Sequence, residues 1–166
     1  MERQFFGRPP GTVAPDLLGH DLVHGEMRGR IVETEAYRGA DDPASHAANG
    51  RTARNAPMFG EPGTAYVYVA YGIHTMLNVV TGEAGEPSAV LIRAVEPGDG
   101  VDRMRENRDA DDLTELCSGP GKLCEAFDIS TADNGSDLLD GDLRIAPGGG
   151  IDDGAVVVDT RIGVSG

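Results

Sequence analysis

The sequence contains no tryptophan and is nearly without lysine and cysteine: one lysine and two cysteines occur among its 166 residues. No run of about 18 apolar residues occurs, so we expect no membrane-spanning helix. The first residues lack the long apolar stretch of a secretory signal, and we expect no such signal. A chain of this length is the size of one ordinary domain with a single core.

The two cysteines, Cys117 and Cys124, lie in a segment that we expect to be helical around a break at residues 118–121. Two turns of helix would separate them by too much for an easy disulfide. We therefore expect two buried free thiols in a reducing cytoplasm.

The charge balance is strongly acidic, with 28 Asp and Glu against 14 Lys and Arg and a net charge of −14. Proteins that bind nucleic acid usually carry a basic surface, so this balance argues against such a partner. The near-absence of lysine favours another explanation, adaptation to a very salty cytoplasm, where carboxylates keep a protein hydrated and soluble. At high salt, phosphate contacts add little affinity and stacking matters more. Acidity alone therefore does not exclude DNA as a partner.

Short apolar runs alternate with Gly and Pro, a pattern typical of many short strands and turns rather than of a helical bundle. We predict one α+β domain over residues 1–166 with a mainly antiparallel sheet. An irregular loop is expected over residues 40–59, and helices over 100–107 and 113–127. The expected strands are 22–24, 30–37, 64–70, 75–80, 89–95, 143–145 and 155–158, the last two at sheet edges.

Two carboxylates stand two residues apart in the strand predicted over 30–37. Strict alternation would place Glu33 and Glu35 on one face with Ile31 and Tyr37, about 7 Å apart, and leave the more apolar face to the core. Such a pair is typical of a solvated strand face, or of an acid and base that activate water. The pattern alone leaves both interpretations open.

Three of the four tyrosines fall in or between two predicted strands, Tyr66 and Tyr68 on one face and Tyr71 in the turn that joins the strands. Aromatic side chains on strands can hold unstacked bases, and one at a hairpin tip can enter a gap between bases. Tyrosine is also an ordinary strand former, and that alternative stays open here.

The histidines and cysteines have no metal-ligand spacing, so we expect no metal. No phosphate-binding loop of the nucleotide or dinucleotide type occurs, and we expect no cofactor. The run Gly-Pro-Gly before Lys122 could place this lysine near a phosphate, although a plain helix junction explains the spacing equally well.

Four long motifs occur in a fixed order along the chain. They are Gly-Arg-Ile-Val-Glu-Thr-Glu-Ala-Tyr at 29–37, Pro-Gly-Thr-Ala-Tyr-Val-Tyr-Val-Ala-Tyr-Gly at 62–72, Val-Leu-Ile-Arg-Ala-Val-Glu-Pro at 90–97 and Leu-Cys-Ser-Gly-Pro-Gly-Lys-Leu-Cys at 116–124. Together they resemble the alkyladenine (3-methyladenine) DNA glycosylase family, of the methylpurine DNA glycosylase type. Its members remove alkylated and deaminated purines from DNA. The resemblance runs from about residue 17 to residue 164.

The resemblance implies a curved sheet with peripheral helices and a protruding hairpin that enters the minor groove, with Tyr71 filling the space left by the flipped base. It implies that Tyr37, His46 and Tyr68 surround the base and that Asn78 guards the pocket entrance. The implied partner is double-stranded DNA containing damaged purines, bound by a monomer, with no membrane involved. We expect a cytoplasmic, nucleoid-associated protein in a high-salt cytoplasm.

For catalysis, the resemblance implies that Glu35 is the general base that activates the attacking water and that Arg93 helps hold the nucleotide and its water. A carboxylate beside the sugar would also stabilise its cationic transition state. The only lysine, Lys122, lies far along the chain from both, so we expect no Schiff-base step and a monofunctional enzyme.

Members of the family continue past the position of Gly166 with a final strand, which we therefore expect to be missing here. Two rival functions stay open. One is a sugar hydrolase that uses Glu33 and Glu35 as its acid and base, although such sites usually have tryptophan platforms. The other is a binding module that kept the base pocket and lost turnover.

Overall fold

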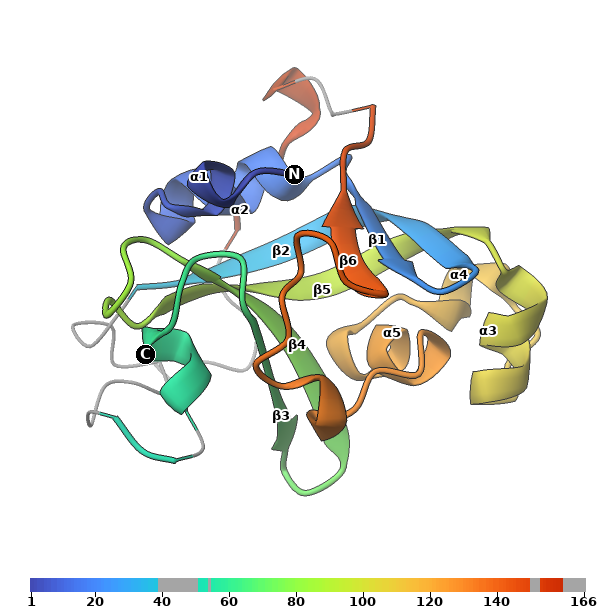
Figure 1. Cartoon of the computed structure of the whole chain (residues 1–166). Helices are drawn as coiled ribbons and strands as arrows, with labels where there is room; N and C mark the ends of the chain where they lie inside the picture. Colours follow the sequence, from blue (N-terminus) through green and yellow to red (C-terminus); the bar gives the residue numbers. More distant parts are fainter. Residues whose placement is uncertain (39–50, 54, 150–152, 160–166) are drawn as a thin grey trace.

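The computed structural model describes residues 1–38, 51–53, 55–149 and 153–159, and these build a six-stranded sheet with helices on both sides (Figure 1). The strand order is β3-β4-β5-β2-β1-β6, with antiparallel neighbours throughout. The strands are β1 (Asp21–His24), β2 (Met27–Tyr37), β3 (Ala65–Ala70), β4 (His74–Thr81), β5 (Ser88–Asp99) and β6 (Leu143–Ala146).

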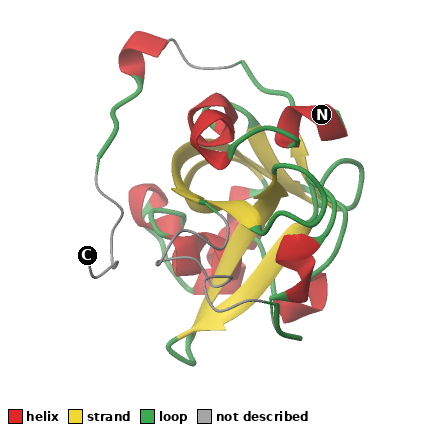
Figure 2. Cartoon of the chain, turned by 90° about the vertical axis from the view of Figure 1, so that its left-hand side faces the viewer, coloured by secondary structure: helices red, strands yellow, loops and turns green. Residues whose placement is uncertain are grey.

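Two short helices, α1 (Arg3–Phe6) and α2 (Pro10–Leu17), cover one side of the sheet, and three others lie on the opposite side (Figure 1). These three are α3 (Val101–Arg108), α4 (Leu113–Leu116) and α5 (Pro120–Ala126). Single 3-10 turns occur at η1 (Ala56–Phe59), η2 (Thr131–Asp133) and η3 (Asp153–Ala155). Figure 2 shows that the sheet curls and that the β3–β4 hairpin projects beyond the body. The α+β fold with a curved antiparallel sheet is confirmed.

Most apolar side chains belong to one large core that packs the sheet against α2 and α5. Its members include Leu17, Leu77, Ile92, Leu123 and Phe127, each with no exposed surface. A smaller second cluster consists of Met58, Tyr66, Val80 and Ala89, with Phe59 and Tyr68 against it. Burying a large apolar side chain stabilises the fold by about 1.5–3 kcal/mol, so the first cluster carries most of the stability.

Both cysteines are buried free thiols, as expected. Cys117 ends α4 and Cys124 lies within α5, on either side of the expected break. Burial raises the pKa of each thiol to about 12, so the reactive thiolate is scarce at neutral pH. No helix in the described ranges is both long and apolar enough to cross a membrane.

The strand predicted over 155–158 is wrong. This stretch begins with the end of the η3 turn and continues without regular structure, and Val157 and Val158 are 87% and 90% exposed. Its valines favour a strand locally, but within the described part of the chain no strand pairs with them. Local preference without a partner does not make a strand.

Strand β5 continues four residues beyond its predicted end at residue 95. Glu96, Pro97 and Asp99 pair with the start of β2, between Arg28 and Arg30. The proline and glycine there suggested a turn. Pairing with a long neighbouring strand outweighs that local preference.

We expect Gly29→Ala to lower the free energy of unfolding by about 1–3 kcal/mol. A Cβ at Gly29 would run into Val95 Cγ1 and come within 2.9 Å of the Glu96 carbonyl oxygen, which is backbone and cannot move aside. Thermal unfolding measures the loss, at roughly 2–4 °C per kcal/mol. Gly11→Ala is the control, because a Cβ in that α2 position meets nothing within 4 Å. Equal midpoints for the two variants would contradict this packing.

Candidate active site

Strand register aligns two of the predicted site residues, Glu35 and Asn78, across the sheet, with Tyr66 in the same row. Glu35 on β2 pairs with Leu91 on β5, Leu91 pairs with Asn78 on β4, and Asn78 pairs with Tyr66 on β3. Directly paired residues present their side chains on the same face. One face therefore carries Glu35, Asn78 and Tyr66 in a row, although their positions span much of the sequence.

Glu35 and Arg93 form an ion pair at this face. Arg93 Nη1 donates to Glu35 Oε2 at 3.2 Å, and the two side chains are only 17% and 7% exposed. An ion pair this sheltered from water is weakly screened, and its hydrogen bond fixes the direction of the carboxylate. The structure thus brings together the two residues expected to be catalytic.

A register irregularity in β2 separates Glu35 from Glu33. Register shifts occur between Ile31 and Glu33 and again between Glu33 and Thr34. The strict alternation assumed over 31–37 does not hold, since Ile31 and Ala36 both pack on the main core. Glu33 is exposed and Glu35 is buried, so their surroundings differ.

Tyrosines occupy the same face one step along the strands. Tyr37 follows Glu35 by two residues and Tyr68 follows Tyr66 by two, and alternation along a regular strand keeps each pair on one face. The rings of Tyr66 and Tyr68 lie 5.2 Å apart between centroids with a 33° tilt. Tyr68 is half-buried against the second cluster, while Tyr66 is fully buried within it.

Tyr66 also holds Asn78 in place, a role that the sequence did not reveal. The side-chain nitrogen Nδ2 of Asn78 donates to the backbone carbonyl oxygen of Tyr66 at 3.2 Å, and Asn78 is 4% exposed. This bond orients the Asn78 side chain at the site. The pairing of β3 with β4 was predicted. Counting residues outward from the hairpin turn would have placed Asn78 opposite Tyr66.

A cavity of about 420 Å³ adjoins the ion pair, within the roughly 300–1,000 Å³ usual for small-molecule sites. It lies between α2, the second half of β2 and the segment 156–159, and both Glu35 and Arg93 line it. Of the residues of β2, only the first four, Met27–Arg30, pair with β1, which leaves room beside the rest of β2. Tyr37, Tyr68 and Asn78 do not line this cavity, so Glu35 lies between it and the aromatic face.

Tyr71 lies at the tip of the β3–β4 hairpin and is 86% exposed. Tyr71 and Gly72 have φ values of 53° and 71°, the successive left-handed residues of a tight hairpin turn. A non-glycine residue rarely adopts this conformation. The turn directs the large aromatic side chain of Tyr71 into solvent. Packing within the described part of the chain therefore does not account for an aromatic residue at this position.

One predicted site residue, His46, lies outside the described residues, as does most of the irregular loop expected over 40–59. Among the residues that are described, no group of three or more His, Cys, Asp or Glu side chains gathers as a metal site would require. The remaining six predicted residues are placed as described: five at or beside one face of the sheet and Tyr71 at the hairpin tip.

Comparison with known proteins gives a consistent result. The family model for methylpurine-DNA glycosylase (MPG) matches residues 4–166. A relative from Prosthecochloris aestuarii is 46% identical over 168 residues, covering 98% of this chain and 81% of its own. One from Methanocella arvoryzae is 48% identical over 170 residues, covering 99% and 84%. One from Rhodopseudomonas palustris (strain HaA2) is 54% identical over 138 residues, covering 83% and 68%. All three carry the name 3-methyladenine DNA glycosylase.

The chain belongs to the methylpurine-DNA glycosylase family. Its class is therefore that of the DNA repair glycosylases, hydrolases that cleave N-glycosidic bonds in DNA. The resemblance carried by the sequence motifs is confirmed at this level. The sugar hydrolase alternative loses its support for two reasons. The chain belongs to a different class of enzyme. Glu33 is exposed whereas Glu35 is buried, so the two carboxylates do not form a matched acid and base pair.

Proposed function

We propose that this enzyme flips alkylated or deaminated purines of the 3-methyladenine type out of duplex DNA and hydrolyses the N-glycosidic bond with water activated by Glu35, leaving an abasic site. The observation that carries the proposal is the sheltered Glu35–Arg93 ion pair beside a cavity of about 420 Å³. An excision assay on duplexes that each carry one such lesion, at low and at molar salt, tests it.

The proposed chemistry needs a fixed carboxylate next to the sugar. As the glycosidic bond breaks, positive charge develops on the sugar, and Glu35 both stabilises this charge and accepts a proton from the attacking water. Arg93 keeps the carboxylate oriented and helps position the nucleotide and its water. Alkylation at N3 or N7 already makes the purine a cationic leaving group, so these lesions need little acid catalysis.

The proposed enzyme is monofunctional, because a lyase step needs an amine that attacks the sugar. The only lysine of the sequence is Lys122. Its ammonium group is engaged by Glu115 Oε2 at 2.9 Å and by Ser118 Oγ at 3.3 Å, on the segment from α4 to α5. No second lysine exists to take its place.

We propose that Tyr37 and Tyr68 stack on the flipped base, that His46 stacks and hydrogen-bonds with it and that Asn78 guards the pocket entrance. The support is that Tyr37, Tyr68 and Asn78 share the sheet face of Glu35. Double-stranded DNA with a damaged purine is the proposed substrate and a monomer the proposed active form. The proposed location is the nucleoid of a high-salt cytoplasm.

We expect Tyr71→Ala to slow the excision of a well-paired hypoxanthine. The activation free energy of excision should rise by a few kcal/mol at most. Without a wedge, the vacated gap collapses and the base restacks before hydrolysis. The loss should be smaller for a lesion in a mismatch, which is already poorly stacked. Single-turnover rates on the two duplexes measure this difference.

Tyr71→Phe is the matched variant, since it keeps the ring and removes only the hydroxyl. It should retain most of the activity, and neither variant should shift the thermal midpoint, because Tyr71 is exposed. Unchanged excision of well-paired hypoxanthine by Tyr71→Ala would mean that this tyrosine is no wedge.

A further inference from the structure

The start of α5 lies directly beside the turn end of the β3–β4 hairpin. A Cβ at Gly121 would come within 3.0 Å of His74 Nδ1, and His74 follows Tyr71 by only three residues. Only a glycine permits so close an approach without displacing His74. The residue next to this contact is Lys122, the sole lysine of the chain. Lys122 therefore belongs to the helix that packs beside the hairpin carrying Tyr71.

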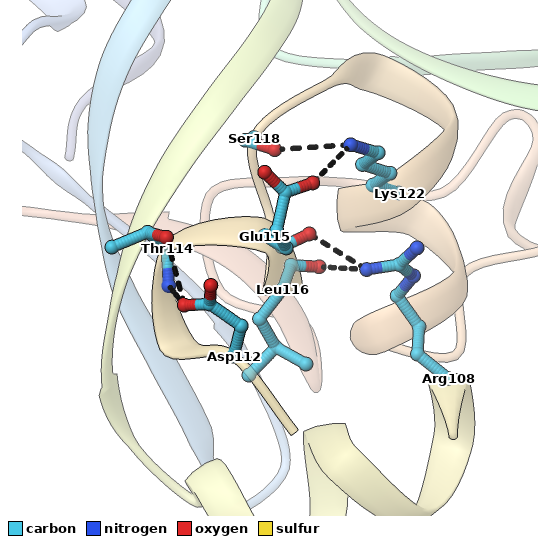
Figure 3. Close-up of polar contacts among 7 residues, drawn as sticks. All are labelled: Arg108, Asp112, Thr114, Glu115, Leu116, Ser118 and Lys122. Carbon is cyan, nitrogen blue, oxygen red and sulfur yellow. Dashed lines mark hydrogen bonds and ion pairs between the residues drawn. The ribbon is translucent and has the colours of Figure 1, made fainter. Parts of the chain in front are cut away.

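Lys122 is engaged by two oxygens from the preceding segment. Its ammonium nitrogen lies 2.9 Å from Glu115 Oε2 and 3.3 Å from Ser118 Oγ, as Figure 3 shows. The Lys122 and Glu115 side chains are 42% and 61% exposed, so the pair lies at the surface. An exposed ion pair contributes little to stability, because water and salt screen it, and its members exchange readily with other charged partners.

The turn that carries Glu115 is fastened at both ends (Figure 3). At its start, Asp112 accepts hydrogen bonds from the Thr114 amide at 3.0 Å and the Thr114 hydroxyl at 2.8 Å. At its end, Arg108 donates to the carbonyl oxygens of Glu115 and Leu116, at 2.7 and 3.1 Å. The backbone of Glu115 is thus held where its carboxylate meets Lys122.

We propose that Glu115 competes with a DNA backbone phosphate for the ammonium group of Lys122 and so limits how tightly the enzyme binds DNA. This inference rests on the proposed function, because it takes the hairpin face as the face that meets DNA. Glu115 and a phosphate oxygen are equivalent partners for an ammonium donor, and Lys122 exchanges one for the other.

The competition has a definite signature in salt. A lysine that already pairs with Glu115 releases few counterions from DNA, so it adds little to the salt dependence of binding. Once the carboxylate is removed, Lys122 becomes a full phosphate contact. Each full contact steepens the plot of log K against log salt by about 0.9.

The test measures binding of an undamaged labelled duplex by fluorescence anisotropy, from about 0.1 M to about 1 M KCl. Over this range the Debye length falls from about 10 Å to about 3 Å. Glu115→Gln should bind several-fold more tightly than the wild type at the dilute end, with a slope steeper by about 0.9. Asp16→Asn is the matched control: it removes a carboxylate paired with Arg8 at 2.8 Å on α2, across the sheet from the hairpin (Figure 1). It should give a much smaller gain.

The double variant Glu115→Gln with Lys122→Gln should lose the gain and bind like Lys122→Gln alone. A gain in DNA affinity that persists without Lys122, or one that Asp16→Asn matches, would overturn the proposed competition. The gain would then come from the change in net charge alone. Excision of a lesion by the wild type is measured in parallel. Failure of the wild type to excise would count against the proposed function, whereas normal excision with no effect of Glu115→Gln would count against this inference alone.

Discussion

Glu35→Gln is expected to reduce base release by at least about 10²–10⁴-fold, the usual contribution of a general base, while binding to lesion-containing duplex is retained. The amide has the shape of the carboxylate, and its oxygen can still accept the hydrogen bond from Arg93. It cannot take a proton from water or stabilise a cationic sugar. The loss should therefore appear in the single-turnover rate and not in the dissociation constant.

Glu33→Gln is the control for this experiment. Glu33 is exposed and separated from Glu35 by a register shift, so its substitution should cost far less activity. Equal losses in the two variants would remove the assignment of Glu35 as the base. A Glu35→Gln protein that no longer binds lesion DNA would likewise place the residue in binding rather than in chemistry.

The second large effect is expected from salt. Both the thermal midpoint and the excision rate should rise, or at least persist, from about 0.1 M to about 3 M KCl, where an ordinary basic glycosylase would have left its DNA. The net charge of −14 makes self-repulsion of carboxylates a substantial cost in dilute buffer. At 1 M salt the Debye length is only about 3 Å, and this repulsion is screened.

The ion pairs of the structure support this expectation. Many basic side chains in the described part of the chain already pair with carboxylates, which leaves fewer of them for phosphates. These are Arg3, Arg8, Arg28, Arg93, Arg103, Arg105 and Lys122. Few phosphate contacts mean a shallow dependence of DNA affinity on salt, with a slope of about −0.9 for each contact.

Thermal unfolding and single-turnover excision, each measured across the same series of KCl concentrations, separate the two contributions. A sodium sulfate series at matched ionic strength is the control for general salting-out, which strengthens apolar burial without depending on surface charge. A protein most stable and most active at the dilute end would show that its acidity has another origin.

The hairpin and its tyrosine were predictable because the signal is local. Two β-rich runs flank Tyr71-Gly72, and glycine in such a turn specifies a tight connection between antiparallel strands. The structure has β3 and β4 in that arrangement, with Tyr71 exposed at the tip. The buried free state of Cys117 and Cys124 was likewise predictable, from residue spacing and a broken helix.

The surroundings of Glu35 were not predictable from local pattern. Strict alternation over 31–37 treats Glu33 and Glu35 alike, and only the register shifts against β5 distinguish them. These shifts depend on pairing with residues about sixty positions away. The contact between Arg93 and Glu35 has the same long-range origin. The resemblance to a known family pointed to each of the two residues, and neither it nor the spacing predicted the contact between them.

The valine run near the C-terminus shows the opposite failure. Residues 155–158 have strong strand preference, and yet Val157 and Val158 are exposed without regular structure. Strand formation depends on hydrogen bonds to a neighbour, so a β-branched run predicts a strand only where the fold supplies a partner. Sequence preference carried no information about that partner.

The most direct test of the account is release of a free purine from a duplex by the wild-type protein. A duplex with a single 3-methyladenine-type or hypoxanthine lesion, incubated with excess enzyme at molar KCl, should yield free base and an abasic strand. That strand should stay intact until it is cleaved by hot alkali. An undamaged duplex of the same sequence should release nothing. No base release from any lesion duplex at any salt concentration would contradict the proposed hydrolysis, and strand cleavage without alkali would contradict a monofunctional enzyme.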